Sequence, residues 1–257
     1  MPELVEAIPC PKCGAPLSLA AGEVIVTCRY CGTASRMRGE KPFVLRHSML
    51  SARLDRAAAE GAITGWMAGG VMTPRDFRRK SRTTSLECTY VPFYVFEVDA
   101  RTSYAGVLTR TGKAVRKQGT LSRNYFWKVL ARRSGDFPLR EYKLPLAHKA
   151  PFDTATMVRE SRFLNAEVDE DEAERIAREQ VDRHQRELLK DEIDTFETAS
   201  TEVIVKDTEF VHAPLWFGTF TYRGRPYVVI VDGASGEIVR GDIPPPGGGL
   251  GEFLRGR

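Results

Sequence analysis

Four cysteines near the N-terminus form two Cys-x-x-Cys pairs, Cys10 with Cys13 and Cys28 with Cys31. The pairs are separated by 14 residues, a spacing typical of a tetrahedral Zn²⁺ site that takes its ligands from two tight turns. Four thiolates leave no coordination position for water or substrate, so we predict one structural zinc ion rather than a catalytic one.

Each cysteine pair is followed directly by a glycine, Gly14 or Gly32, which lets the backbone curl beneath the metal. Residues 24–27 (VIVT) predict a short strand that leads into the second pair. Two disulfides or a redox dithiol are the alternatives. Disulfides belong to oxidising compartments, and no export signal precedes these cysteines. We therefore favour zinc and expect a cytoplasmic protein.

The other residues that could do chemistry form no recognisable catalytic pattern. The four histidines are scattered among different expected elements. Residues 233–237 (GASGE) differ from a nucleophile elbow, because the second glycine follows the serine directly and the context is strand–turn–strand. A phosphate-binding loop and a dinucleotide fingerprint are also missing from the sequence. We therefore expect a non-enzymatic protein, and no small-molecule substrate is indicated.

Charge is distributed unevenly along the chain. Residues 101–149 contain twelve Lys or Arg and two acidic residues, whereas residues 153–209 contain eighteen acidic and eight basic residues. Four thiolates with one Zn²⁺ would lower the formal net charge from +4 to +2. The asymmetry indicates either nucleic-acid binding by the basic segment or pairing of the basic and acidic halves with each other.

Aromatic residues lie among the cations of the basic segment, at residues 124–128 (NYFWK). Rings that stack on bases, beside cations that follow phosphates, suit single-stranded nucleic acid. We favour the alternative, in which the rings pack into the core and the cations form a solvated rim. The candidate nucleic-acid-binding residues are Arg116, Lys117, Arg123, Tyr125, Trp127, Lys128, Arg132 and Arg133.

Helices are expected at residues 49–60, 74–80 and 168–193. The third has the clearest signals, a capping box and one apolar stripe that also carries His184 as a core residue. The capping box is Asp169 with Glu172, the stripe is Ala173, Ala177, Val181 and Leu188, and the expected ion pairs are Glu174–Arg178, Glu179–Arg183 and Asp182–Arg186.

A long strand is expected over residues 86–100, with Pro92 marking a bulge or edge. Strands at 210–223, 227–231 and 237–240 are joined by turn-rich links, which predicts an antiparallel meander. A helix followed by such a meander indicates an α+β fold, with the helix across one face of the sheet. A weak likeness between residues 90–96 and 212–218 suggests two divergent half-repeats.

The expected domains are a zinc ribbon at 1–40, an α+β body at 41–243 and a flexible Pro/Gly tail at 244–257. The body would divide into halves at 41–164 and 165–243. The longest apolar stretch, residues 62–73, is too short and too rich in glycine to be a transmembrane segment.

As a set, these motifs resemble a bacterial and archaeal family labelled zinc ribbon domain-containing proteins, whose function is unassigned. The resemblance covers most of the chain and its most specific part is the Pro-Leu-Trp strand with the hairpin of residues 227–236, which is also similar to PepSY-type domains. Many members continue into transmembrane helices just after the position of residues 242–244, and this chain instead ends in a polar tail. The family implies architecture and no established activity.

We therefore expect a zinc-ribbon adaptor that acts through contacts with macromolecules and has a protein partner. The alternative is binding of RNA or a nucleoprotein, for example the ribosome, through residues 101–149. Binding through phosphates should weaken steeply with salt, because each neutralised phosphate releases counterions.

Overall fold

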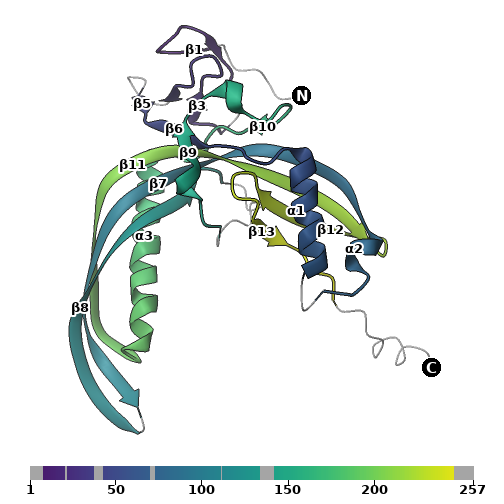
Figure 1. Ribbon diagram of the computed structural model, residues 1–257. Helices are drawn as coiled ribbons and strands as arrows, with labels where there is room; N and C mark the ends of the chain where they lie inside the picture. The colour runs from purple at the N-terminus through teal and green to yellow at the C-terminus, as the bar shows by residue number, and fades with distance from the viewer. Residues whose placement is uncertain are drawn as a thin grey trace. The chain divides into compact units, whose positions relative to one another are not determined.

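The computed structural model describes residues 8–20, 22–37, 43–69, 73–110, 112–133 and 142–245 (Figure 1). The fold is mixed and rich in strands, and its sheets are mainly antiparallel, as the sequence predicted. The predicted tail lies almost wholly outside the described residues. None of the described helices is both long and apolar enough to cross a membrane.

Three α-helices lie in the described ranges, α1 (Arg56–Gly69), α2 (Phe77–Lys80) and α3 (Glu170–Leu188). The strands are β1 (Ile8–Pro9), β2 (Pro16–Leu17), β3 (Ile25–Thr27), β4 (Ala34–Arg36), β5 (Phe43–Leu45), β6 (His47–Leu50), β7 (Ser81–Arg110), β8 (Lys113–Leu130), β9 (Lys149–Pro151), β10 (Arg162–Phe163), β11 (Thr195–Tyr222), β12 (Arg225–Asp232) and β13 (Ile238–Gly241).

The chain divides into two compact units, and β7 and β11 each contribute to both. This division does not follow the halves 41–164 and 165–243, and it gives no support to the half-repeat hypothesis. Unit 1 comprises residues 1–48, 92–133 and 165–211, and unit 2 comprises residues 49–91, 134–164 and 212–257.

The two longest strands, β7 and β11, are neighbours in the largest sheet. Their pairing is visible in two threonine contacts, Thr102 with Thr201 in unit 1 (Oγ1–Oγ1 3.0 Å) and Thr84 with Thr219 in unit 2 (2.7 Å). The two residue numbers of each pair have the same sum, so β7 and β11 run antiparallel in one register at both places.

The predicted meander is confirmed, because β11 pairs antiparallel with β12 and β12 pairs antiparallel with β13. The strands are longer than predicted at the polar ends. Residues 101–110 of β7 continue the ladder with β8, and β11 begins at Thr195 rather than near residue 210. The added stretches are mostly polar, and most of their residues are exposed or half-buried, so pairing with neighbouring strands rather than burial keeps them extended.

The helix predicted at residues 49–60 is displaced. Met49 and Leu50 lie buried in β6, and α1 begins at Arg56. Asp55 accounts for the start of the helix, because its Oδ1 accepts a hydrogen bond from the Ala58 N–H at 2.8 Å. The buried positions Ala59, Ile63 and Met67 then recur every four residues.

The predicted N-terminus of α3 is confirmed, since Asp169 Oδ1 accepts from the Glu172 N–H at 2.9 Å. The apolar stripe ends differently from the prediction, because Gln185 is buried and Leu188 is 41% exposed. Buried positions continue at a spacing of four from Val181 to Gln185, which carries Leu188 off the stripe. The ion pairs on the outer face are Arg175–Glu179, Glu174–Arg178 and Asp182–Arg186, so the predicted Glu179–Arg183 pair is wrong.

The two longer helices cover different parts of the sheet (Figure 1). In unit 1, α3 packs against β8, and in unit 2, α1 packs against β12 and β13. As predicted, the helix that precedes the meander lies across one face of the sheet, where it packs against β7, β8 and the first part of β11. The meander strands β12 and β13 are instead covered by α1. Since α1 ends more than 120 residues before the meander begins, short-range sequence patterns could not assign it that role.

Candidate metal centre

The four predicted metal ligands come together, with their Sγ atoms all within 4.8 Å of one another. The Cys10–Cys31 and Cys13–Cys28 sulfur pairs are 3.7 and 3.6 Å apart. A regular tetrahedron with metal–sulfur bonds of about 2.3 Å has sulfur–sulfur separations of about 3.8 Å. The cluster therefore fits a four-coordinate metal ion. All five cysteines lie in the described part of the chain, and each is free of a disulfide.

Two similar tight turns place the cysteines. The Gly14 N–H donates to the Cys10 carbonyl at 2.9 Å, and the Gly32 N–H donates to the Cys28 carbonyl at 2.8 Å. Both glycines are left-handed, with φ of +73° and +72°, a conformation that costs glycine little. This confirms the turns predicted from the glycine that follows each pair.

The inner side of this ribbon belongs to the core of unit 1. Val26 packs with Cys10 and Cys28, whereas its neighbour Ile25 packs in the cluster that contains Phe96. The Val24 N–H also donates to the Ala166 carbonyl at 2.8 Å. The strand before the second cysteine pair thus joins the sulfur cluster to the larger hydrophobic core.

His47 also connects the ribbon to the rest of unit 1. Its Nδ1 lies 2.8 Å from the Gly32 carbonyl oxygen, and its ring centroid is 5.4 Å from that of Phe210. Burial lowers the pKa of His47 to about 4, so the ring is neutral at physiological pH. Sequence reasoning missed this residue, since residues 32 and 47 share no motif.

The outer side of the second turn exposes a large ring. Tyr30, between Cys28 and Cys31, is 75% exposed. Two cations nearby in the ribbon sequence, Lys12 and Arg29, are also exposed. A small module that exposes an aromatic ring and cations has a surface suited to contact with another molecule.

The aromatic residues of the basic segment lie on β8 and alternate in direction. Trp127 Nε1–H donates to Gln180 Oε1 on α3 at 2.8 Å, and the rings of Tyr125 and Trp127 are each 5.4 Å from the His184 ring. Phe126, on the opposite face of the strand, is 68% exposed. Tyr125 and Trp127 therefore pack against the core of unit 1, as our favoured alternative expected, whereas its expectation for Phe126 is wrong.

Several cations of the same segment pair with the acidic half of the chain. Arg132 lies 2.8 Å from Glu167 and Arg133 pairs with Glu172. The remaining candidates differ in their surroundings. Arg116 pairs with Glu197 in an exposed position, burial lowers the pKa of Lys128, and Lys117 and Arg123 form no ion pair with a described residue.

Cys88 and His212 are buried away from the sulfur cluster. Burial raises the pKa of the Cys88 thiol to about 12, so it is a protonated thiol and a poor nucleophile at neutral pH. His212 Nε2 lies 2.9 Å from the Leu164 carbonyl oxygen, and its ring stacks on Phe163 at 4.1 Å. Both residues pack as parts of the core of unit 2.

No family model, curated protein or solved structure matches this chain. The resemblance to zinc ribbon domain-containing proteins therefore depends on sequence motifs, of which the cysteine cluster has the expected ribbon-like geometry. The likeness to PepSY-type domains gains no support.

Proposed function

We propose that this chain is a non-enzymatic zinc-ribbon adaptor, which holds one structural Zn²⁺ at its four cysteines and docks onto a protein partner through the ribbon. An all-thiolate donor set with tetrahedral spacing suits Zn²⁺, although iron accepts the same ligands. The chemistry of such an ion would be structural, because four sulfurs complete its coordination.

The exposed Tyr30 ring is the observation that supports docking most directly. Tyrosine and arginine are enriched among residues that dominate binding energy, and rigid support reduces the entropy lost on binding. Tyr30 is held between two metal ligands, and the turn behind it is fixed by the Gly32 hydrogen bond to Cys28. The ring would therefore be presented in one orientation.

A co-purification experiment with the full chain tests this function. Wild type should retain a stable protein partner, Tyr30→Ala should lose it, and Phe126→Ala should keep it, because Phe126 is a comparably exposed ring elsewhere in unit 1. Zinc content should be equal in all three proteins. Absence of a stable partner for wild type, or retention by Tyr30→Ala, would contradict the proposal.

Binding of RNA or a nucleoprotein is the second candidate, supported by exposed Phe126 and by Arg123 and Lys117 on β8, which form no ion pair with a described residue. β8 is also the edge of the sheet in unit 1, where cations commonly prevent pairing with other chains. The ribbon ring would then be a second contact.

Salt-titrated binding of mixed RNA to the full chain separates the two functions. RNA binding predicts that Arg123→Gln lowers the salt slope by about 1, and that Phe126→Ala weakens binding by about 1–3 kcal/mol. Arg225→Gln, an exposed cation of unit 2, is the matched control. No retention of RNA at low salt would leave only the protein adaptor.

A further inference from the structure

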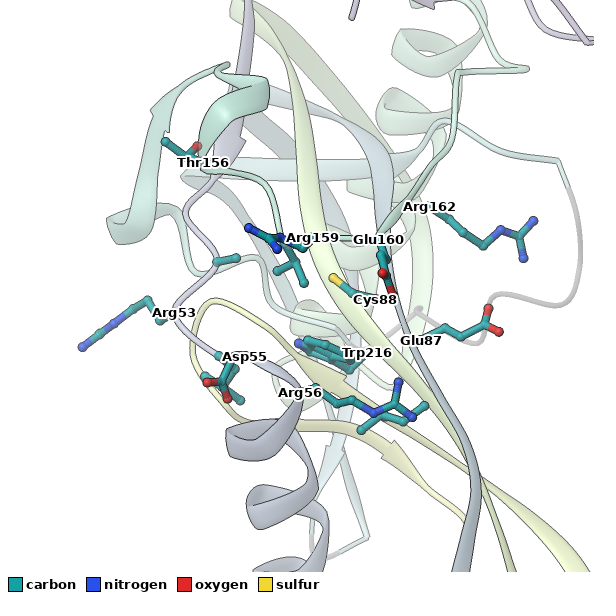
Figure 2. A pocket seen from close by; sticks show the side chains of 14 residues that line it. Arg53, Asp55, Arg56, Glu87, Cys88, Thr156, Arg159, Glu160, Arg162 and Trp216 are labelled. Carbon is teal, nitrogen blue, oxygen red and sulfur yellow. The ribbon is translucent and has the colours of Figure 1, made fainter.

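Unit 2 contains an open pocket of about 920 Å³ that sequence reasoning did not anticipate (Figure 2). Its wall comes from the segment that leads into α1, from β7, from residues 156–162 and from β11. A pocket of this size can hold a small organic molecule. It is separate from the cysteine cluster, which lies in unit 1.

The inner part of the pocket is apolar and well buried. Leu86 and Cys88 are buried on β7, and Trp216 of β11 is 3% exposed. Trp216 Nε1 is buried without a hydrogen-bond partner among the described residues. A buried indole N–H is normally hydrogen-bonded, so an acceptor supplied by a ligand would complete this wall.

The outer part of the pocket is charged and exposed. Arg53, Arg159 and Arg162 line it and form no ion pair within the described chain, whereas Arg56 pairs with Glu60 at 3.3 Å. In Figure 2, Arg159 lies over the buried wall near Cys88, whereas Arg53 and Arg162 point outward.

Three carboxylates also line this pocket. Asp55 is engaged with the first turn of α1, through the Ala58 N–H, which leaves Glu87 and Glu160. In Figure 2, Glu87 points outward and Glu160 lies beside Cys88. Asp55 keeps its charge, so the three carboxylates equal the three unpaired arginines in number. Arg159 is the arginine that lies over the apolar wall, and it favours a ligand that places a carboxylate there.

We propose that the pocket of unit 2 binds a small organic anion with a flat apolar body and one carboxylate group. The apolar body would lie on Leu86, Cys88 and Trp216. The carboxylate would accept hydrogen bonds from the Arg159 guanidinium and from the Trp216 indole N–H, which has no acceptor among the described residues. Cys88 acts as a wall here, because its thiol stays protonated.

The test uses indole N–H resonances of the full, ¹⁵N-labelled chain, with the Trp216 signal assigned by its loss in Trp216→Phe. The probes are 2-naphthoate, the neutral 2-naphthalenemethanol and the cationic 2-naphthylmethylammonium. We expect a saturable shift of the Trp216 signal, and binding of naphthoate about tenfold tighter than of the alcohol. Binding at millimolar probe without saturation, or tighter binding of the cation, would overturn the proposal.

Two variants locate the carboxylate. Arg159→Gln should weaken naphthoate binding about tenfold and leave the alcohol unchanged, whereas Arg225→Gln should change neither. Both arginines are exposed and without ion pairs, so both variants should fold. Equal weakening of both probes in Arg159→Gln would contradict the assigned role. None of these outcomes depends on the zinc ribbon, which leaves the adaptor proposal to its own experiment.

Discussion

Two tryptophans, one in each unit, differ in what their indole N–H groups contact. Trp127 in unit 1 donates to Gln180, and its ring packs on His184. Trp216 in unit 2 is more deeply buried, lines a pocket and has no hydrogen-bond partner in the part of the chain that the structure describes. Trp127 lies in the basic segment that suggested nucleic-acid binding, yet its polar group is satisfied internally. The difference shows that local charge is a poor guide to which indole N–H finds its hydrogen-bond acceptor within the chain.

The same contrast extends to the helices of the two units. In unit 1, α3 covers the sheet and contacts Trp127 of β8 through the His184 ring. Two arginines that follow β8, Arg132 and Arg133, pair with Glu167 and Glu172. In unit 2, the segment leading into α1 leaves an opening lined by unpaired arginines. The contrast concerns these particular groups: Trp127, Arg132 and Arg133 have partners inside unit 1, whereas the Trp216 indole N–H has none among the described residues.

Loss of a metal ligand should give the largest effect and should be confined to unit 1. Cys28→Ser should abolish zinc binding and melt the ribbon, because metal binding supplies most of the folding free energy of such a small module. The Trp216 indole signal of unit 2 should keep its chemical shift. Cys88→Ala is the control and should retain zinc. Full metal content in Cys28→Ser would contradict the assigned ligand set.

Glycine substitutions should destabilise each unit separately. A Cβ at Gly106 would lie 2.3 Å from the Thr195 carbonyl oxygen in unit 1, and one at Gly241 would lie 2.1 Å from the Trp66 ring in unit 2. We expect Gly106→Ala to cost about 3 kcal/mol and Gly241→Ala about 1–2 kcal/mol, because a side chain can move more readily than backbone.

Urea denaturation with separate probes for each unit measures these costs. Gly65→Ala, in open space on α1, is the control and should stabilise by about 0.5–1 kcal/mol. If each substitution shifted the transitions of both units equally, the two units would unfold as one.

Removing the acceptor of the Trp127 indole N–H tests how much this internal hydrogen bond contributes to the stability of unit 1. Gln180→Leu should lower the free energy of unfolding by about 1 kcal/mol, since it leaves the indole N–H of a partly buried ring without its partner. Gln180→Glu keeps an acceptor and should cost less. Equal stability of the leucine variant and the wild type would show that this hydrogen bond does not stabilise unit 1, which would contradict the contrast with Trp216.

Acid should weaken unit 1 through His47, with the smallest expected effect. Its pKa falls from 6.5 to about 4 on burial, so the unfolded chain binds more protons between these values. Its contribution to stability is therefore full above pH 6.5 and is lost as the pH falls towards 4. Urea titrations across this range should show a flatter pH dependence of the free energy of unfolding for His47→Gln than for wild type.

Features set by neighbouring residues could be predicted from the sequence. The cysteine turns depend on the spacing of four residues and on Gly14 and Gly32, and the start of α3 depends on Asp169. The hairpin turns of the meander likewise lie within short stretches. In each case the physical cause acts within a few residues along the chain.

Features set by distant segments could not be predicted in the same way. The extension of β11 to Thr195 depends on pairing across the sheet, and the burial of Gln185 depends on what α3 covers. The pocket joins Arg53, Cys88, Arg159 and Trp216, which are far apart in the sequence. These residues come together only when the chain is folded, so no stretch of the sequence indicates the pocket.

The most direct test of the proposed function is the metal content of the full chain, purified without added metal. Elemental analysis and native mass spectrometry should find one Zn²⁺ per chain, bound to four deprotonated cysteines, and Cys28→Ser should contain none. Absence of metal from the wild-type chain, or iron in place of zinc, would contradict the zinc-ribbon account.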